Sequence, residues 1–301
     1  MIDPRASDGA GGRPIFRFAP SPNGYLHLGH AFSALLNFRW AKMAGGKFLL
    51  RIEDIDPERS RRPFEAALIE DLRWLGVDWD ETPRRQSDHL ADYRQALEGL
   101  TQRGLAYPCF CSRGDIGQIC ATEVNWPRDP DGAFLYPGTC RALSPAERTE
   151  RVAAGARWSL RLDMAKALSQ FAQPLTYNEY HEGETGRIVV AQPELWGDAL
   201  IGRRDVPASY HIACTLDDDA QGVTDVARGV DLEPVTGLHR LLQALLGLRT
   251  PRYRHHRLVL DGEGRKLSKS KAAQSLRDLR DGGVAAETIR ADLSRLMKIT
   301  L

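Results

Sequence analysis

Residues 17–30 of the chain read Arg-Phe-Ala-Pro-Ser-Pro-Asn-Gly-Tyr-Leu-His-Leu-Gly-His, and they join a predicted strand at 15–19 to a predicted helix at 29–43. The prolines stiffen the loop, and Gly29 lets the backbone approach a ligand closely. The helix that follows offers unpaired N–H groups and a positive dipole to a phosphate. His27 and His30 are three residues apart, so they can face one way and donate hydrogen bonds to phosphate oxygens. Taken alone, the two histidines are equally consistent with solvent-facing residues at a helix start.

The alternation of strand and helix continues along the chain. Pro63 suits the first turn of a helix, and Ser87 suits an N-cap. We expect further strands at 47–52, 199–203 and 223–227, and further helices at 63–75, 87–102, 235–246 and 286–299. Strand, glycine-bearing loop and helix in alternation predict an α/β fold with a doubly wound parallel sheet of the Rossmann type.

The chain is predicted to divide into four parts. Residues 1–12 are rich in Gly and Asp and are expected to form a loose tail. Cys, Pro, Asp and Gly interrupt the alternation at 108–142, which predicts an insertion, and residues 152–180 show no clear pattern. We expect a catalytic domain at 13–107 and 190–250, an inserted subdomain with a cysteine knuckle at 108–189, and a C-terminal segment at 251–301 with a Lys/Ser loop and a short helix.

Composition excludes several classes of protein. With 42% hydrophobic and 27% charged residues, the chain is neither disordered, collagen-like nor a disulfide miniprotein. Its net charge of +1 excludes a histone-like protein that binds nucleic acid through overall positive charge. Any contact with RNA must therefore be made by a local basic patch, and the first candidate is the basic segment 249–271. The longest uncharged run, 18–38, is too polar for a membrane span. The first residues form no apolar signal core, so a cytoplasmic location is expected.

A second segment, Lys266-Leu267-Ser268-Lys269-Ser270, follows a predicted hairpin turn at 261–264. Two lysines and two hydroxyls on a loop can clamp a triphosphate and follow the leaving pyrophosphate. By itself, such a segment is usually a solvated loop.

The two segments together resemble the class I aminoacyl-tRNA synthetases, in which they bind ATP from opposite sides. The runs Arg-Phe-Ala-Pro-Ser-Pro at 17–22, Arg-Ile-Glu-Asp-Ile-Asp-Pro-Glu-Arg-Ser at 51–60 and Gly-Val-Thr-Asp-Val-Ala-Arg-Gly-Val-Asp at 222–231 resemble the glutamyl branch. The resemblance covers most of residues 15–275. It implies Mg²⁺ with the nucleotide, catalytic roles for His27, His30, Lys266 and Lys269, and an ATP site made by His27, Gly29, His30, Lys266, Ser268 and Lys269.

Glutamate needs cations for two carboxylates and an anion for one ammonium. Arg17 and Arg228 are the guanidinium candidates, and Glu53 is the candidate partner of the ammonium. Alternatively, Glu53 pairs with a neighbouring arginine on the surface, and Tyr210 is a core residue. The acidic run 217–219 is as consistent with a solvated turn as with a substrate contact. The resemblance implies a glutamate site made by Arg17, Phe18, Ala19, Pro20, Ser21, Glu53, Tyr210 and Arg228.

Three of the five cysteines lie between Cys109 and Cys120, which in a reducing compartment suggests a metal before disulfides. The pattern resembles the zinc knuckle of the glutamyl branch, in which a tyrosine oxygen joins three cysteines. The resemblance implies one structural Zn²⁺ on Cys109, Cys111, Tyr136 and Cys140. Cys120 replacing Tyr136, or loss of the metal, are the alternatives.

The chain as a whole resembles the truncated members of that branch, the glutamyl-queuosine tRNA(Asp) synthetases. Thirty-one residues follow Ser270, whereas full-length glutamyl enzymes continue into a long helical anticodon-binding region. The resemblance implies that a monomer activates L-glutamate with ATP and transfers it to queuosine in the anticodon loop of tRNA(Asp). The alternatives are a truncated enzyme charging the 3′ end of tRNA(Glu), a silent RNA-binding module, and an enzyme that adenylylates a small cofactor.

Overall fold

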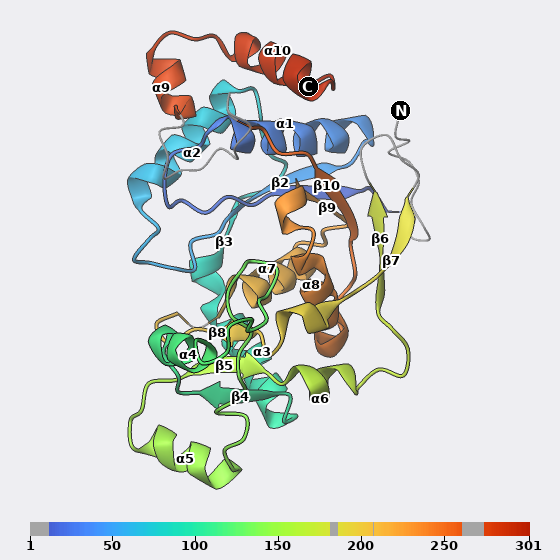
Figure 1. Ribbon diagram of the computed structural model, residues 1–301. Coiled ribbons are helices and arrows are strands. Elements are labelled where there is room, and N and C mark those ends of the chain that lie inside the picture. The colour runs from blue at the N-terminus through green and yellow to red at the C-terminus, as the bar shows by residue number, and fades with distance from the viewer. Residues whose placement is uncertain (1–11, 181–185, 207, 261–273) are drawn as a thin grey trace.

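A seven-stranded sheet forms the centre of the molecule in this computed structural model, which describes residues 12–180, 186–206, 208–260 and 274–301 (Figure 1). Its strand order is β3-β2-β1-β9-β10-β6-β7, and all neighbours are parallel except the β6–β7 pair at one edge. The strands are β1 (Ile15–Phe18), β2 (Lys47–Ile52), β3 (Arg84–Arg85), β6 (Thr176–Tyr180), β7 (Arg187–Val190), β9 (Asp225–Gly229) and β10 (Arg252–His256).

Helices cover both faces of this sheet, which confirms the predicted doubly wound α/β fold. On one face lie α1 (Leu28–Met43) and α2 (Arg62–Trp74), and on the other lie α3 (Leu90–Gln102), α7 (Tyr210–Ala220) and α8 (Val235–Leu246) (Figure 1). Strands buried on both faces read as continuous apolar runs, and residues 48–52 of β2 are all buried. The two largest hydrophobic clusters of the described residues lie around α1 and around α8.

A second, antiparallel sheet has the order β4-β5-β8. Its strands are β4 (Ala106–Cys109), β5 (Ser159–Leu162) and β8 (Leu200–Gly202). The strand predicted at 199–203 is therefore present, but it does not continue the parallel sheet. A short apolar run shows that a strand forms and does not show which sheet it joins. The helices α4 (Arg113–Cys120), α5 (Pro145–Ala153) and α6 (Met164–Leu168) and the short 3₁₀ turn η2 (Pro193–Trp196) lie between β4 and β8 along the chain, whereas the 3₁₀ turn η3 (Val230–Leu232) follows β9 of the main sheet.

The predicted cap at Ser87 is wrong. Ser87 lies inside the 3₁₀ turn η1 (Gln86–His89), and α3 begins only at Leu90. Both the backbone N–H and the hydroxyl of Ser87 donate to Asp54, at 2.9 and 2.7 Å. The Ser87 hydroxyl therefore bonds to a carboxylate distant in sequence, whereas the local pattern predicted that it would cap the helix.

Sheet membership crosses the predicted domain boundaries. Strand β6 and all but the last residue of β7 fall within the range predicted as the inserted subdomain, yet the two strands form one edge of the main sheet. Strand β10 falls within the predicted C-terminal segment, yet it lies between β9 and β6. Residues 152–180, which showed no clear pattern, contain β5, α6 and β6.

In the described part of the basic segment 249–271, Arg249 and Arg257 are exposed, whereas two other arginines face a buried carboxylate. Arg252 and Arg254 lie on β10 and pair with the buried Asp225, at 2.6 and 3.4 Å. Only 4% of Arg254 is exposed. Residues 261–271, including Lys266, Ser268 and Lys269, lie outside the described ranges.

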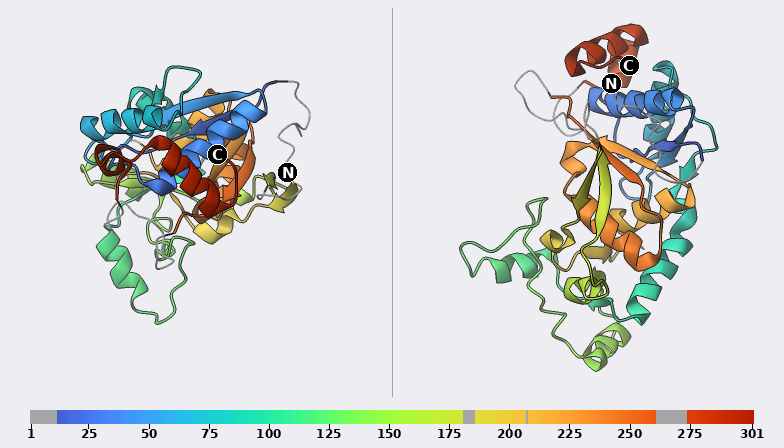
Figure 2. Two further views of the ribbon diagram at one scale, coloured as in Figure 1. Left: turned by 90° about the horizontal axis from the view of Figure 1, so that it is seen from above. Right: turned by 90° about the vertical axis from the view of Figure 1, so that its right-hand side faces the viewer.

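Two helices near the C-terminus, α9 (Leu276–Asp281) and α10 (Ala286–Met297), pack against the α1 face, at the opposite end of the molecule from α5 (Figure 2). The Leu276 N–H donates to the Leu26 carbonyl at 2.7 Å, and Leu293 joins the core around α1. None of the helices in the described ranges combines the length and the apolar character that crossing a membrane requires.

Candidate active site

A cavity of about 450 Å³ lies at the carboxyl ends of β1 and β9. Strand order reverses between these two strands, and ligands of open α/β sheets bind at such a switch point. All eight residues expected to contact glutamate line it: Arg17, Phe18, Ala19, Pro20, Ser21, Glu53, Tyr210 and Arg228. His27, Gly29 and His30 line the same cavity. The structure thus brings the residues predicted to bind glutamate together with the part of the predicted ATP site that lies in the described ranges.

Arg17 reaches the cavity from β1 and is 4% exposed. Its Nε donates to Asp218 Oδ1 at 2.9 Å, and Nη1 of Arg51 donates to the same oxygen at 2.7 Å. Burial raises the pKa of Asp218, but the two guanidiniums outweigh it and hold that pKa below its usual value. The carboxylate therefore stays charged and holds both arginines in place.

Glu53 pairs with Arg51, the partner that the alternative interpretation proposed, but does so inside the protein rather than on the surface. Arg51 Nη2 lies 3.1 Å from Glu53 Oε1, and Glu53 is 8% exposed. Burial raises the pKa of Glu53, although Arg51 and Arg17 oppose the shift. Since Glu53 also lines the cavity, the pairing leaves it in position to meet a ligand ammonium.

Arg228 stands at the end of β9 and is 5% exposed. Its Nη2 donates to Thr236 Oγ1 at 2.7 Å, and its Nη1 lies 3.3 Å from His239 Nδ1. Tyr210 lines the same cavity, so it is not simply a core residue. Burial raises the pKa of Tyr210 well above its ordinary value, which keeps the hydroxyl protonated at neutral pH.

The acidic run 217–219 is neither a solvated turn nor a lining of the cavity. It lies on α7, and Asp217 and Asp218 are buried. Asp217 accepts hydrogen bonds from Arg84 at 2.8 Å and from the Tyr93 hydroxyl at 2.9 Å. Asp217 therefore links α7 to β3 through Arg84 and to α3 through Tyr93.

His27 and His30 form the N-terminal cap of α1. His27 Nδ1 accepts from the Gly29 N–H at 3.1 Å, and His30 Nδ1 accepts from the His27 N–H at 3.2 Å. The ring centroids lie 3.9 Å apart. Because both Nδ1 atoms accept, the proton of each neutral ring lies on Nε2. This cap orients both imidazoles at the helix terminus.

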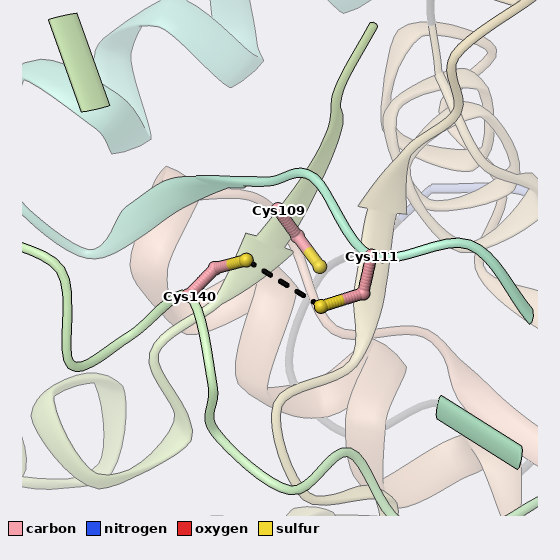
Figure 3. A group of neighbouring side chains, drawn as sticks. All are labelled: Cys109, Cys111 and Cys140. Atoms are coloured by element: carbon pink, nitrogen blue, oxygen red, sulfur yellow. Dashed lines mark hydrogen bonds between the residues drawn. The ribbon is translucent and has the colours of Figure 1, made fainter. Parts of the chain in front are cut away.

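Three cysteines converge beside the small sheet (Figure 3). The sulfur atoms of Cys109, Cys111 and Cys140 all lie within 4.8 Å of one another, and Cys111 Sγ lies 3.6 Å from Cys140 Sγ. The Tyr136 hydroxyl lies 3.5 Å from Cys111 Sγ. Cys120 is buried elsewhere, with its sulfur 3.9 Å from the Leu135 carbonyl oxygen. The structure therefore brings the predicted four ligands together and leaves Cys120 outside the cluster.

The donor set fits a zinc ion chemically. Zinc prefers about four thiolate, imidazole or oxygen ligands in a tetrahedron. Burial raises the pKa of the Cys111 thiol to about 11. A bound cation favours the thiolate, so it supplies what this buried thiol needs to ionise at neutral pH.

Sequence reasoning did not find the supporting roles of Asp218, which holds Arg17 and Arg51, and of Thr236, which holds Arg228. One local signal existed: Arg51 lies near the end of β2 and Glu53 follows that strand directly, so the two residues are two apart in sequence. Nothing local indicates that residue 218 meets residue 51, because that contact depends on the packing of α7 against the sheet.

Comparisons with known proteins agree with this geometry. Residues 15–298 match the family model described as tRNA synthetases class I (E and Q), catalytic domain. A glutamyl-Q tRNA(Asp) synthetase from Rhodobacter capsulatus is 46% identical over 278 residues, 92% of this chain and 98% of that protein. A glutamate–tRNA ligase 2 from Acidithiobacillus ferrooxidans is 41% identical over 93% of this chain and 57% of its own length.

Solved structures show the same likeness. The crystal structure of a glutamate tRNA ligase from Elizabethkingia meningosepticum, in complex with its amino acid, superimposes with a TM-score of 0.70 at 29% identity. The match covers 90% of this chain and 53% of that one, so this chain spans about half the length of that ligase. The chain belongs to the class I aminoacyl-tRNA synthetases of the glutamate and glutamine type, whose catalytic domain it carries.

Proposed function

We propose that this protein activates L-glutamate with ATP and transfers it to the queuosine base at the wobble position of tRNA(Asp). The observation that carries the proposal is the single cavity in which two buried guanidiniums, a buried carboxylate and two helix-capping histidines meet. The acceptor is supported by the Rhodobacter relative, to which the chain aligns over 98% of that protein's length.

In the proposed first step, a carboxylate of glutamate attacks the α-phosphorus of ATP, and pyrophosphate leaves. Arg17 and Arg228 bind the carboxylates of the amino acid, and Glu53 binds its ammonium. Nε2 of His27 and of His30 donates to phosphate oxygens as negative charge builds on them. Lys266 and Lys269, with Gly29 and Ser268, complete the nucleotide site, and Mg²⁺ accompanies ATP and neutralises part of its charge.

In the proposed second step, a hydroxyl of the queuosine ring attacks the mixed anhydride, and AMP leaves. The enzyme forms no covalent bond to the substrate, so the buried Cys214 needs no catalytic role. The proposed enzyme acts as a monomer. It acts in the cytoplasm, where ATP and tRNA are its substrates.

Cys109, Cys111, Cys140 and Tyr136 are the proposed ligands of one structural zinc. The three sulfurs lie within 4.8 Å of one another, which a tetrahedral site requires. The ion would fix the fold of the insertion and would supply no chemistry to the reaction.

The test is mass spectrometry of the tRNA nucleosides after incubation with glutamate, ATP and total tRNA. The proposal expects queuosine to gain the mass of one glutamate less one water, as ester formation requires. The 41% identity to a glutamate–tRNA ligase favours 3′-end charging as the second candidate. Removing the 3′ terminus of the tRNA decides between them: acceptance continues if queuosine is the acceptor, and it stops if the terminal ribose is.

A further inference from the structure

Behind the cavity wall, Arg228 is held by a set of buried polar side chains that the proposed reaction does not use. Nη2 donates to Thr236 Oγ1 at 2.7 Å, and Nε donates to His255 Nε2 at 3.5 Å. Nη1 faces His239 Nδ1 at 3.3 Å. These contacts engage three of the five N–H groups of the guanidinium and leave two to face a carboxylate.

The hydrogen-bond pattern around His255 defines its tautomer. Nδ1 lies 2.7 Å from Glu179 Oε1, and a carboxylate only accepts, so the ring proton is on Nδ1. Nε2 is then an acceptor, and Thr236 Oγ1 lies 3.2 Å from it. Thr236 therefore accepts from Arg228 and donates to His255.

Glu179 is itself fixed from the edge of the sheet. Arg187 donates to Glu179 Oε2 from Nε at 3.0 Å and from Nη2 at 2.8 Å. The chain Arg187–Glu179–His255–Arg228 thus crosses β7, β6, β10 and β9, four strands that are consecutive in the sheet. Neither Glu179 nor His255 has an exposed side chain, so the guanidinium is oriented by groups that cannot relax into water.

The same place offers a second interpretation, as a metal site. Ligand atoms of Glu179, Glu233 and His255 lie within 4.8 Å of one another. Arg187 already occupies Oε2 of Glu179, and Arg228 adds a second positive charge beside His255. Two guanidiniums repel a divalent cation, so the charges favour a positioning role.

We infer that Glu179, His255 and Thr236 are positioning residues that fix the direction in which Arg228 presents its N–H groups to the carboxylate of the amino acid. The inference rests on the proposed function, because it takes glutamate as the ligand of Arg228. Orientation of one guanidinium governs binding of the amino acid and leaves the nucleotide site unchanged. The expected signature is therefore a raised KM for glutamate with an unchanged KM for ATP.

The experiment measures glutamate-dependent ATP–pyrophosphate exchange for the full chain, three test variants and one control variant. Thr236→Val keeps the shape of the side chain and removes its hydroxyl, and His255→Leu removes both ring nitrogens. Each is expected to raise the KM for glutamate about tenfold, the scale of one weakened hydrogen bond to a charged group. His255→Gln returns an acceptor close to Nε2 and is expected to recover most of that loss.

Tyr253→Phe is the matched control on the same strand. It removes a buried hydroxyl that accepts from Gln243 Nε2 at 2.7 Å, and it keeps the ring beside Arg228. It is expected to lower the thermal unfolding temperature without changing the KM for glutamate. Thermal unfolding of all four variants shows that each is folded at the assay temperature.

The outcomes separate the two claims. No glutamate-dependent exchange by the unaltered protein contradicts the proposed function and, with it, the role given to Arg228. Normal exchange combined with an unchanged KM for glutamate in Thr236→Val and in His255→Leu contradicts the positioning role alone. So does a His255→Gln variant that is no better than His255→Leu, or an equal rise in the KM for ATP.

Discussion

Arg51 and Asp218 form an ion pair in which Nη1 lies 2.7 Å from Oδ1, with 0% and 8% of the two side chains exposed. It joins β2 to α7 across 167 residues of sequence. The same carboxylate oxygen accepts from Arg17, and the same guanidinium donates to Glu53. The ion pair therefore holds in place one cation and one anion that line the cavity, Arg17 and Glu53.

Replacing Asp218 with Asn is expected to lower the free energy of unfolding by about 3 to 5 kcal/mol, because it leaves two buried guanidiniums without their counter-charge. Urea denaturation measures the loss. The control is Asp292→Asn, whose pair with Arg295 is exposed and is expected to contribute nothing measurable. A loss no larger than that of the control would show that the buried pair does not hold this site together.

Replacing His30 with Ala is expected to lower the kcat of glutamate-dependent pyrophosphate exchange by about 10²- to 10³-fold, because one donor to the reacting phosphate is lost. The variant also loses part of the α1 cap, which costs about 1 kcal/mol of stability and is measured separately by denaturation. His89→Ala, at a histidine outside the cavity lining, is the control. Turnover near that of the unaltered protein would refute the role of His30.

Asp71 is expected to make stability depend on pH. It is buried on α2, and burial raises its pKa to about 6 even though Arg280 Nη1 lies 3.2 Å from Oδ1. A carboxyl group whose pKa is raised in the folded state stabilises the fold while protonated, and it loses that contribution as the pH rises through the folded-state pKa.

Asp71→Asn is therefore expected to gain stability relative to the unaltered protein by on the order of 2 kcal/mol between about pH 4 and pH 7. Urea denaturation across that range measures the difference. Glu70→Gln is the matched control, since Glu70 also contacts Arg280, at 3.0 Å, but is 64% exposed. A difference that stays constant with pH would contradict the shifted pKa of Asp71.

Cys140→Ser is expected to abolish binding of one zinc per chain, measured as metal content by mass spectrometry after purification in the presence of zinc. Loss of one of three thiolates removes most of the affinity of such a site. Tyr136→Phe is expected to weaken binding, and Cys120→Ser is expected to leave it intact. Zinc retained by Cys140→Ser, or lost on replacing Cys120 alone, would show that the ligand set is wrong.

Local patterns determined the elements whose partners lie close in sequence. Residues 47–52 were predicted as a strand and 235–246 as a helix, and both are observed with those bounds. Spacing alone also placed His27 and His30 at one helix start, where they now form a cap. These features follow from periodicity, capping and turn chemistry within a few residues.

Long-range pairing decided the rest. Arg252 and Arg254 look like part of a basic surface patch in the sequence, and only the position of β10 between β9 and β6 buries them against Asp225. Ser87 looks like a helix cap until Asp54 captures it.

The α/β class could be read from the amino-acid sequence alone, and so could the side chains that we propose as partners of ATP, glutamate and zinc. Only the tertiary structure decided how those side chains are held, because Arg51 with Asp218 and Glu179 with His255 meet through strand order and helix packing. Contacts between residues this far apart in sequence leave no periodicity along the chain, so they become visible only once the sheet is assembled.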